Sequence, residues 1–220
     1  MAEEYLDDNP GGSGRAALAG YDYQMDVSVW LALVLVVANK QASELVLEPA
    51  TQEDIEGTLE EFEPGRVTGE VRLGATKLVV QAKLRGGDAW SVNAIQTLLK
   101  YGGKNRVSAA QRLADPEVHY LLVTSAGLNG KAARLRVKKP GLWPDAADFP
   151  ASLKKVLPAD SGGRVGVISN KEPEQFETEI RVLLMDAFRV PTAQWQACLK
   201  ALREEARIRI RGAAQGHWRH

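Results

Sequence analysis

The chain has little of the chemistry on which disulfide-bonded and zinc-binding proteins depend. Its 220 residues include one cysteine, Cys198, and three histidines. A single cysteine excludes an internal disulfide, and neither the cysteine nor the histidines have the spacing of a zinc site. Cysteine usage of this kind is typical of a reducing compartment, so we expect a cytoplasmic protein.

Long hydrophobic runs and signal sequences are also missing. The longest apolar stretch, 27–38, is interrupted by Ser28 and is shorter than the roughly 20 residues that a membrane helix needs. The N-terminus is acidic, whereas a secretory signal starts with basic residues and continues with an apolar segment. The sequence has no nucleophile elbow and no glycine-rich phosphate loop, so covalent acyl transfer and nucleotide hydrolysis have no support.

The formal net charge is zero, but acidic and basic residues are separated along the chain. Residues 1–70 hold 15 acidic and 3 basic residues, whereas residues 71–220 hold 13 acidic and 25 basic ones. An acidic part that can hold a metal, followed by a basic part, is what a protein that cleaves polyanions needs. The alternative is that solvated helix faces simply differ in sign.

The hydrophobic pattern predicts a layered α/β fold. Hydrophobic residues make up 45% of the chain, which is enough for the core of one large domain, or of a domain with an appendage. Helix and strand patterns follow one another in mixed order. The expected elements are a buried helix at 15–38, strands at 44–47, 67–73 and 77–84, a helix at 89–101 with Asp88 as its cap, a helix at 104–113, strands at 118–124 and 164–169, and helices at 174–188 and 192–211.

Carboxylates and a Gln-x-Lys triplet lie at or inside two of the expected strands. Glu48 ends the first strand and Asp54 follows it, while Gln81 and Lys83 lie inside the third strand. Because side chains alternate along a strand, Gln81 and Lys83 share one face. Carboxylate and amide oxygens can hold Mg²⁺, and an ammonium beside the metal can stabilise the charge that grows on a phosphate. The combination predicts hydrolysis of a phosphodiester bond.

Each of these residues also has an ordinary structural explanation. Lys83 fits a solvent-facing lysine on an edge strand, and together with Gln81 it fits a polar outer face. Asp54 fits one member of a solvated acidic run, and Glu48 fits the end of a strand. Gln24, on the apolar helix, fits either a hydrogen bond within the core or an approach to a metal. The acidic cluster upstream of Gln81 favours a site over a polar face.

The pattern resembles the PD-(D/E)xK superfamily of restriction-endonuclease-like proteins, in the variant that has glutamine in place of the second acid. More narrowly, it is similar to the double-stranded DNA endonuclease domain at the N-terminus of CBASS and related STAND-type antiviral effectors. The resemblance covers about residues 15–190. The segments that carry it are GYDYQ at 20–24, LE at 47–48, EDI at 53–55, VQAK at 80–83 and YLLVTS at 120–125.

The resemblance implies a restriction-endonuclease-like mixed β-sheet core of order αβββαβ, flanked by helices, with additional C-terminal helices. Position by position, Asp54 corresponds to the aspartate of the motif, Gln81 to the substituted acid and Lys83 to the lysine. Asp54, Gln81 and Glu48 are then expected to hold Mg²⁺ or Mn²⁺, with Gln24 as a supporting residue. Because a glutamine offers only a neutral oxygen, Glu48 would have to compensate for the missing second carboxylate.

The implied activity is metal-dependent endonuclease cleavage of double-stranded DNA, as the effector domain of a bacterial antiphage defence system. Residues 1–14 are then a flexible lead, and 191–220 a C-terminal helix that links to sensor or oligomerisation domains of a longer chain. The resemblance further implies a homo-oligomer on activation. Candidates for contacts with DNA phosphates, by their charge, are Arg85, Lys104 and Arg106. The alternative is a catalytically inactive nucleic-acid-binding or protein-interaction module on the same fold.

Overall fold

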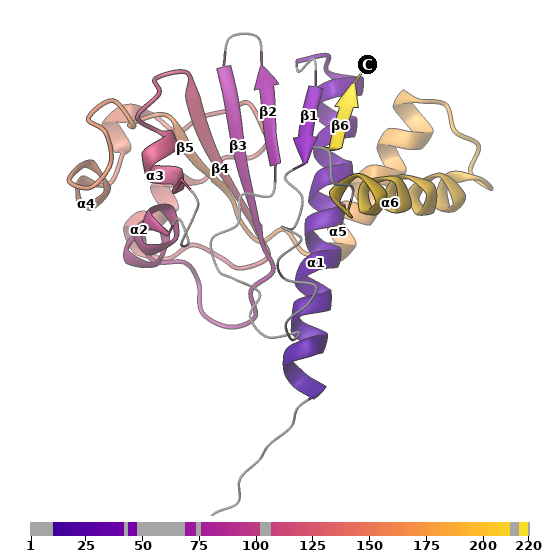
Figure 1. Ribbon diagram of the computed structural model, residues 1–220, viewed down its shortest axis with the longest axis horizontal. Helices are drawn as coiled ribbons and strands as arrows, with labels where there is room; N and C mark the ends of the chain where they lie inside the picture. Colours follow the sequence, from indigo (N-terminus) through magenta and orange to yellow (C-terminus); the bar gives the residue numbers. More distant parts are fainter. Residues whose placement is uncertain are drawn as a thin grey trace, which may run out of the picture.

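A six-stranded mixed β-sheet forms the middle layer of the protein (Figure 1). The computed structural model describes residues 11–41, 44–47, 69–73, 76–101, 107–211 and 216–219. The strand order across the sheet is β5-β4-β3-β2-β1-β6. The strands are β1 (Glu44–Leu47), β2 (Gly69–Leu73), β3 (Thr76–Lys83), β4 (Val118–Thr124), β5 (Val165–Ile168) and β6 (Gly216–Arg219).

The sheet is antiparallel on one side of β3 and parallel on the other. β1, β2 and β3 form an antiparallel meander, in which Leu73 pairs with Thr76 at the β2–β3 hairpin. β3, β4 and β5 run parallel to one another. Parallel strands are usually covered on both faces, and β4 and β5 have the continuous apolar sequences that such burial requires. The α/β class predicted from the sequence is confirmed.

Helices cover both faces of the sheet, and most of them are short. The long helix α1 continues directly into a π-helical segment, η1, and α5 continues in the same way into η5. The helical elements are α1 (Gly11–Leu31), η1 (Ala32–Ala38), α2 (Val92–Lys100), α3 (Ala109–Arg112), η3 (Gly130–Leu135), η4 (Ala146–Asp148), α4 (Ala151–Lys154), α5 (Pro173–Val182), η5 (Leu183–Ala187) and α6 (Trp195–Arg211).

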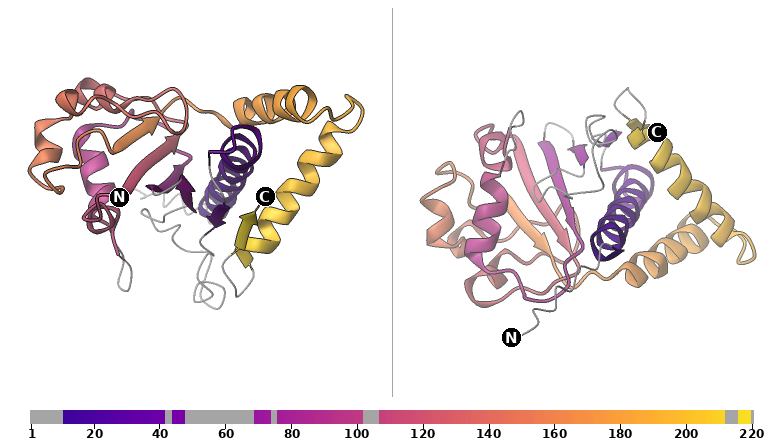
Figure 2. Two further views of the ribbon diagram at one scale, coloured as in Figure 1. Left: turned by 90° about the horizontal axis from the view of Figure 1, so that it is seen from above. Right: turned by 60° about the horizontal axis from the view of Figure 1, so that its bottom comes forward.

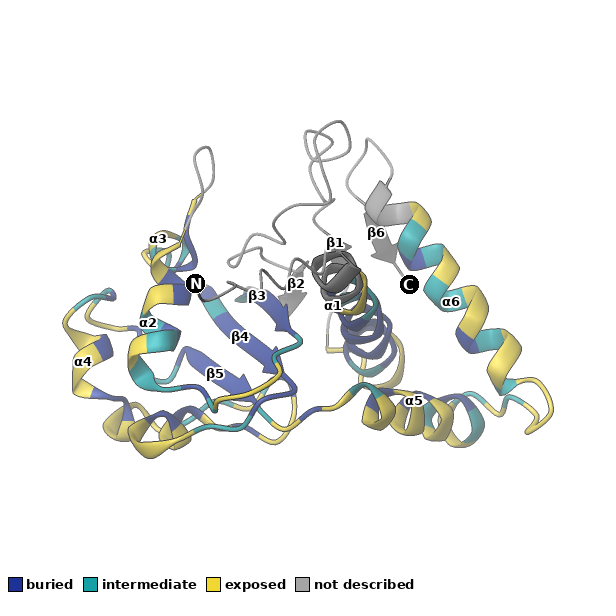
Figure 3. Ribbon diagram, turned by 90° about the horizontal axis from the view of Figure 1, so that it is seen from below, coloured by how far each residue is buried: buried dark blue, intermediate teal, exposed yellow. Residues whose placement is uncertain are grey.

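Alternating side chains of β3 enter two separate hydrophobic clusters. Leu78, Val80 and Ala82 belong to the first cluster, which β3 shares with α1, α5, η5 and α6. Figure 2 shows α1 lying between the sheet and the pair α5 and α6. Val79 belongs to the second cluster, together with residues of α2, η3, α4 and β5. β3 and β4 are therefore buried on both faces, as their colouring in Figure 3 shows.

The predicted buried helix is confirmed, and it is longer than the sequence indicated. It begins at Gly11, inside the segment expected to be a flexible lead, since adding residues to an existing helix gains one backbone hydrogen bond for each residue fixed. By length and composition the helical run Leu18–Ala38 is able to cross a membrane. Because 67% of that run is buried inside the protein, packing against the sheet and α5 already accounts for its apolar surface.

Two predicted helices begin later than expected because serine side chains cap them. Ser91, and not Asp88, is the cap of α2, since its Oγ accepts a hydrogen bond from the backbone N–H of Ala94 at 3.2 Å. Ser108 forms a capping box with Gln111 at the start of α3, so this helix is shorter than the predicted 104–113. A serine cap satisfies an N–H group that the first turn of a helix leaves unpaired.

The C-terminal elements pack against the rest of the domain. β6 pairs with β1 and extends the sheet. α6 lies along α1, where Arg203 binds Asp26 at 2.6 Å and Arg207 binds Asp22 at 3.1 Å. Both pairs repeat with helical spacing, so they fix one face of α6 against one face of α1. The link from this region to sensor or oligomerisation domains of a longer chain stays a prediction.

The two ion pairs differ in burial, and this generates a matched test. The Asp26 carboxylate is 8% exposed and that of Asp22 is 50% exposed. Burial raises the pKa of Asp26, and the hydrogen bond and charge of Arg203 oppose that rise. We expect Arg203→Ala to lower the free energy of unfolding by about 1–3 kcal/mol, because it leaves a buried charge unpaired. Arg207→Ala, the control, is expected to cost under about 1 kcal/mol.

Urea denaturation of both variants measures this difference, and its pH dependence has a defined sign. The folded state holds a proton on Asp26 more tightly than the unfolded state does, so acidification relieves the cost of the buried charge. The stability deficit of Arg203→Ala should therefore shrink as the pH falls through the raised pKa of Asp26. Equal deficits in the two variants at neutral pH would contradict the assignment of Asp26 as the buried partner.

Candidate active site

Gln81 and Lys83 lie on an interior strand and are both buried. Gln81 is 1% exposed and Lys83 is 7% exposed. β3, which carries them, has β2 on one side and β4 on the other. The sequence also allowed two structural interpretations, namely a solvent-facing lysine on an edge strand and a polar outer face. The buried position of both residues on an interior strand contradicts these two interpretations. Glutamine and lysine are rarely buried without a specific reason, so the two residues mark a candidate site.

The amide of Gln81 is held at one end only. The hydroxyl of Tyr120, on the neighbouring strand β4, donates a hydrogen bond to Oε1 of Gln81 at 2.5 Å. The other end of the amide, Nε2, is buried and has no hydrogen-bond partner among the described residues. An unpartnered buried polar group costs about 1–3 kcal/mol, and such costs are commonly retained where a group serves a ligand.

Arg85 is held at the carboxyl end of β3, two residues beyond Lys83. Its guanidinium carbon lies 4.4 Å from the centre of the Trp90 ring. The hydroxyl of Ser125 accepts a hydrogen bond from the Arg85 backbone N–H at 2.9 Å and donates one to its carbonyl at 3.2 Å. Trp90 is fixed in turn, since its Nε1 donates to the hydroxyl of Thr124 at 3.0 Å. The guanidinium is therefore positioned in advance, as recognition of a phosphate requires.

The chain leaves β1 at the end of the sheet where Gln81 and Lys83 lie. β1 and β3 both run antiparallel to β2, so they run in the same direction. Val46 pairs with Glu70, and Glu70 pairs with Val79, which places Val46 and Val79 in one row across the sheet. Both strands therefore advance from that row towards the same edge.

Several predicted site residues lie outside the residues that the structure describes. These are Glu48, Asp54, Lys104 and Arg106. Within the described ranges, no three histidine, cysteine, aspartate or glutamate side chains gather closely enough to hold a metal ion. The metal site expected from Asp54, Gln81 and Glu48 is thus represented in the described structure by Gln81 alone.

Gln24 lies on the other face of the sheet from Gln81 and Lys83. It is half-buried on α1, the helix that packs on the first cluster, and Gln81 and Lys83 are on the opposite face of β3. Its backbone carbonyl accepts a hydrogen bond from the hydroxyl of Ser28 at 2.8 Å. Its supporting role stays a prediction.

The sequence did not predict Tyr120, Trp90, Thr124 or Ser125 as site residues, although the segment 120–125 carried part of the resemblance. Tyr120 is the hydroxyl-bearing residue inside the apolar run of β4, and Thr124 and Ser125 are the polar residues at its end. Polar residues at the carboxyl end of a buried parallel strand are a usual position for functional groups. That signal was present in the sequence, but the pairing with Gln81 depends on the β3–β4 register, which the sequence alone does not reveal.

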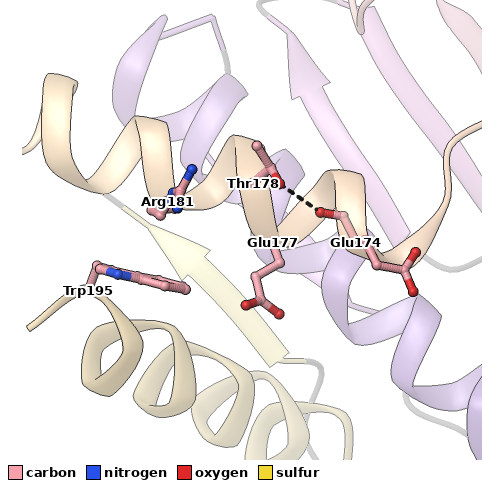
Figure 4. A pocket seen from close by; sticks show the side chains of 5 residues that line it. All are labelled: Glu174, Glu177, Thr178, Arg181 and Trp195. Atoms are coloured by element: carbon pink, nitrogen blue, oxygen red, sulfur yellow. Dashed lines mark hydrogen bonds between the residues drawn. The ribbon is translucent and has the colours of Figure 1, made fainter. Parts of the chain in front are cut away.

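A shallow pocket between α5 and α6 is a weaker candidate. It has a volume of about 250 Å³ and is lined by Glu174, Glu177, Thr178, Arg181 and Trp195 (Figure 4). Two of the lining side chains are acidic and one is basic, and the Thr178 hydroxyl donates to the backbone carbonyl of Glu174 within its own helix. No buried polar group points to a ligand among these lining residues, so this pocket does not define a reaction.

Comparison of the chain with protein-family models, with curated proteins and with solved structures gives no match. The resemblance to restriction-endonuclease-like proteins therefore stays a prediction that depends on the motif residues.

The half-satisfied amide of Gln81 generates a stability test. Gln81→Met removes the acceptor of the buried Tyr120 hydroxyl, so we expect a loss of about 1–3 kcal/mol in the free energy of unfolding. In the double variant Gln81→Met with Tyr120→Phe, both polar partners are gone. Stability should then return to within about 0.5 kcal/mol of the wild type or exceed it. Urea denaturation without metal measures both values.

The opposite result is equally clear. If the double variant is as unstable as the sum of the two single variants, the two substitutions act independently. The hydrogen bond between Tyr120 and Gln81 would then contribute no coupling energy, and the expectation would be wrong.

Proposed function

We propose that this chain is a metal-dependent endonuclease with a restriction-endonuclease-like fold, and that Asp54, Gln81, Glu48 and Lys83 form its active site. The observation that carries the proposal is the burial of Gln81 and Lys83 on one face of an interior strand, with the Gln81 amide left unpartnered at one end. A glutamine and a lysine at this spacing are the residues that the sequence motif singled out.

The order of the elements supports the proposal. A long helix, three antiparallel strands, a helix and a strand parallel to the third occur in this order as α1, β1–β3, α2 and β4, with the short helix α3 between α2 and β4. This is the αβββαβ order that the resemblance implies. The direction of β1 also supports it, because Glu48 is the next residue in the sequence after β1 ends.

The unpartnered end of the Gln81 amide is its N–H₂ group, which only donates, so it fits a hydrogen-bond acceptor beside it, such as a carboxylate or a water. Asp54 and Glu48 would contribute charged oxygens, and Gln81 a neutral one. Bound Mg²⁺ or Mn²⁺ supplies positive charge to the phosphate and lowers the pKa of a coordinated water.

Lys83 and Arg85 act on the phosphate in this proposal. Lys83 follows Gln81 by two residues on β3, so the two side chains lie on the same face of the strand, and Arg85 lies two residues beyond the end of the strand. The Lys83 ammonium, in a water-poor position, offers a full charge to the phosphate oxygens that become more negative during hydrolysis. Arg85, held over Trp90, binds a phosphate of the same substrate.

The substrate in this proposal is double-stranded DNA. Exposed basic residues follow one another through η3 and the segment after it, namely Lys131, Arg134, Arg136, Lys138 and Lys139. Such a series neutralises phosphates without reading the base sequence. By the same resemblance, the chain acts in the cytoplasm as the effector domain of an antiphage system, and it assembles as a homo-oligomer with sensor domains of a longer chain.

Cleavage of a supercoiled plasmid tests the proposal. With Mg²⁺ or Mn²⁺, the wild type should convert the plasmid to nicked and linear forms. Asp54→Ala and Lys83→Ala should each lower the rate about 100-fold or more, since each removes a charge that acts on the reacting phosphate.

Lys77→Ala is the matched control. Lys77 lies on the same strand and the same face as Lys83, but at the other end, where its side chain is 36% exposed and pairs with Asp115. Its substitution should leave cleavage unchanged. Circular dichroism checks that the variants fold. If Lys83→Ala cleaves as fast as Lys77→Ala, Lys83 is not part of the active site and the proposal fails.

A further inference from the structure

The guanidinium of Arg85 is held by an aromatic ring and not by a carboxylate. Its central carbon lies 4.4 Å from the centre of the Trp90 ring. Within the described part of the chain, no side chain or carbonyl accepts a hydrogen bond from this guanidinium. Arg164 and Arg203, in contrast, bind carboxylates of the protein itself. Stacking restrains the plane of a guanidinium and leaves the N–H groups at its edge for another acceptor.

The Trp90 ring cannot follow the arginine, because its own position is fixed. It is 6% exposed and belongs to the second hydrophobic cluster. Its Nε1 donates to the hydroxyl of Thr124, which is fully buried. The Trp90 backbone N–H donates to the carbonyl of Gly127 at 2.8 Å, and its carbonyl accepts from the N–H of Asn129 at 3.0 Å. The ring therefore determines where the guanidinium lies.

The loop that follows Arg85 leaves room for a ligand. A side-chain carbon added at Gly86 or Gly87 would meet no atom within 4 Å, and Gly87 has a φ of +96°. Asp88, the acidic residue of this loop, is exposed and pairs with no base among the described residues. The loop lies at the carboxyl end of the parallel strands β3 and β4, an edge where α/β sheets commonly bind ligands.

We propose that Trp90 is a positioning residue, which presents the guanidinium of Arg85 to a backbone phosphate of a nucleic acid, and that Thr124 acts through Trp90 by fixing its indole. The inference rests on the proposed function for its choice of DNA, but it requires no metal. The planar guanidinium matches two oxygens of one phosphate. Because the side chain is already ordered, binding costs less side-chain entropy than it does for a mobile arginine.

Binding of a fluorescent DNA duplex to the whole 220-residue chain in EDTA tests the inference by anisotropy, without cleavage. Arg85→Ala should weaken binding about tenfold and reduce by about 1 the slope of the logarithm of the affinity against the logarithm of the salt concentration. Arg85→Lys keeps the charge and should keep the slope. It should still lose about threefold or more in affinity, because an ammonium does not stack as a guanidinium does. Binding of Arg85→Lys as tight as that of the wild type would overturn the inference.

Trp90→Phe distinguishes positioning from packing. It keeps a ring in the cluster but removes the bond to Thr124 and the larger indole surface. We expect DNA affinity to fall about three- to fivefold in the wild-type background, and by less than about 1.5-fold when Arg85 is already alanine. Thr124→Val, which keeps the shape of the side chain, should show the same dependence on Arg85. Circular dichroism checks folding. Equal losses in both backgrounds would assign a purely structural role to Trp90 and overturn the inference.

Arg181→Ala is the matched control. Arg181 also lies over a tryptophan, with its guanidinium carbon 5.8 Å from the centre of the Trp195 ring. This pair lines the pocket between α5 and α6, whose helices pack in the first cluster. Its substitution should leave both the DNA affinity and the salt slope unchanged. An equal loss in Arg181→Ala and Arg85→Ala would show a general effect of net charge, and the inference would fail.

A small phosphate is the other ligand with the same chemistry. Isothermal titration with inorganic phosphate alone measures it. If phosphate binds saturably, Arg85→Ala abolishes that binding and the duplex does not bind, the site belongs to a small phosphate compound and the inference is overturned.

The remaining outcomes separate this inference from the proposed function. If the duplex binds with the expected dependence on Arg85 and Trp90 but no plasmid is cleaved, the inference stands and the nuclease fails. If plasmid is cleaved and Arg85→Ala binds the duplex as tightly as the wild type, the nuclease stands and the inference fails. If the wild type neither binds the duplex nor cleaves the plasmid, both fail.

Discussion

Strand β3 is covered by helices on both faces, so a polar side chain in its buried part loses its hydrogen bonds to water, and the protein must replace them or bear the cost. Leu78, Val80 and Ala82 are apolar and pack beneath α1, while the other face changes from Val79 to Gln81 and Lys83 towards the carboxyl end. The Tyr120 hydroxyl meets one end of the Gln81 amide, and the fixed register of β3 and β4 sets that contact. Burial on both faces therefore turns two polar residues into a defined arrangement.

The helices on the two faces of β3 also differ in the charges that they carry. On the first face, α1 offers Asp22 and Asp26 to the arginines of α6, so acidic residues of the N-terminal part are used for packing. The exposed basic residues of η3, Lys131 and Arg134, belong to the other layer, because Ala132 and Leu135 of the same element pack in the second cluster. The charge asymmetry along the sequence thus serves both helix packing and an exposed basic surface.

The sequence predicted well those elements that follow from local hydrophobic periodicity. It predicted poorly those elements that depend on pairing between residues far apart in the sequence. The apolar runs of β4 and β5 and the alternation in β2 and β3 were sufficient to find these strands, and the coarse α/β class followed. The strand β6 could not be predicted, because Gly216–Arg219 has no apolar run and is a strand through its pairing with β1. For the candidate site, motif spacing identified Gln81 and Lys83 but not their burial, which depends on β4. Tyr120 was missed because its partner is distant in the sequence.

The addition of β6 to the sheet has a consequence for how the protein is made. Glu44 pairs with Arg72 on one side and with Arg219 on the other, so the second partner is synthesised long after the first. During translation, the outer edge of β1 has no strand to pair with until nearly the whole described chain has left the ribosome. Unpaired strand edges recruit other chains, and contacts between distant residues form slowly. We therefore expect the nascent protein to depend on chaperones until β6 has been synthesised and has paired with β1.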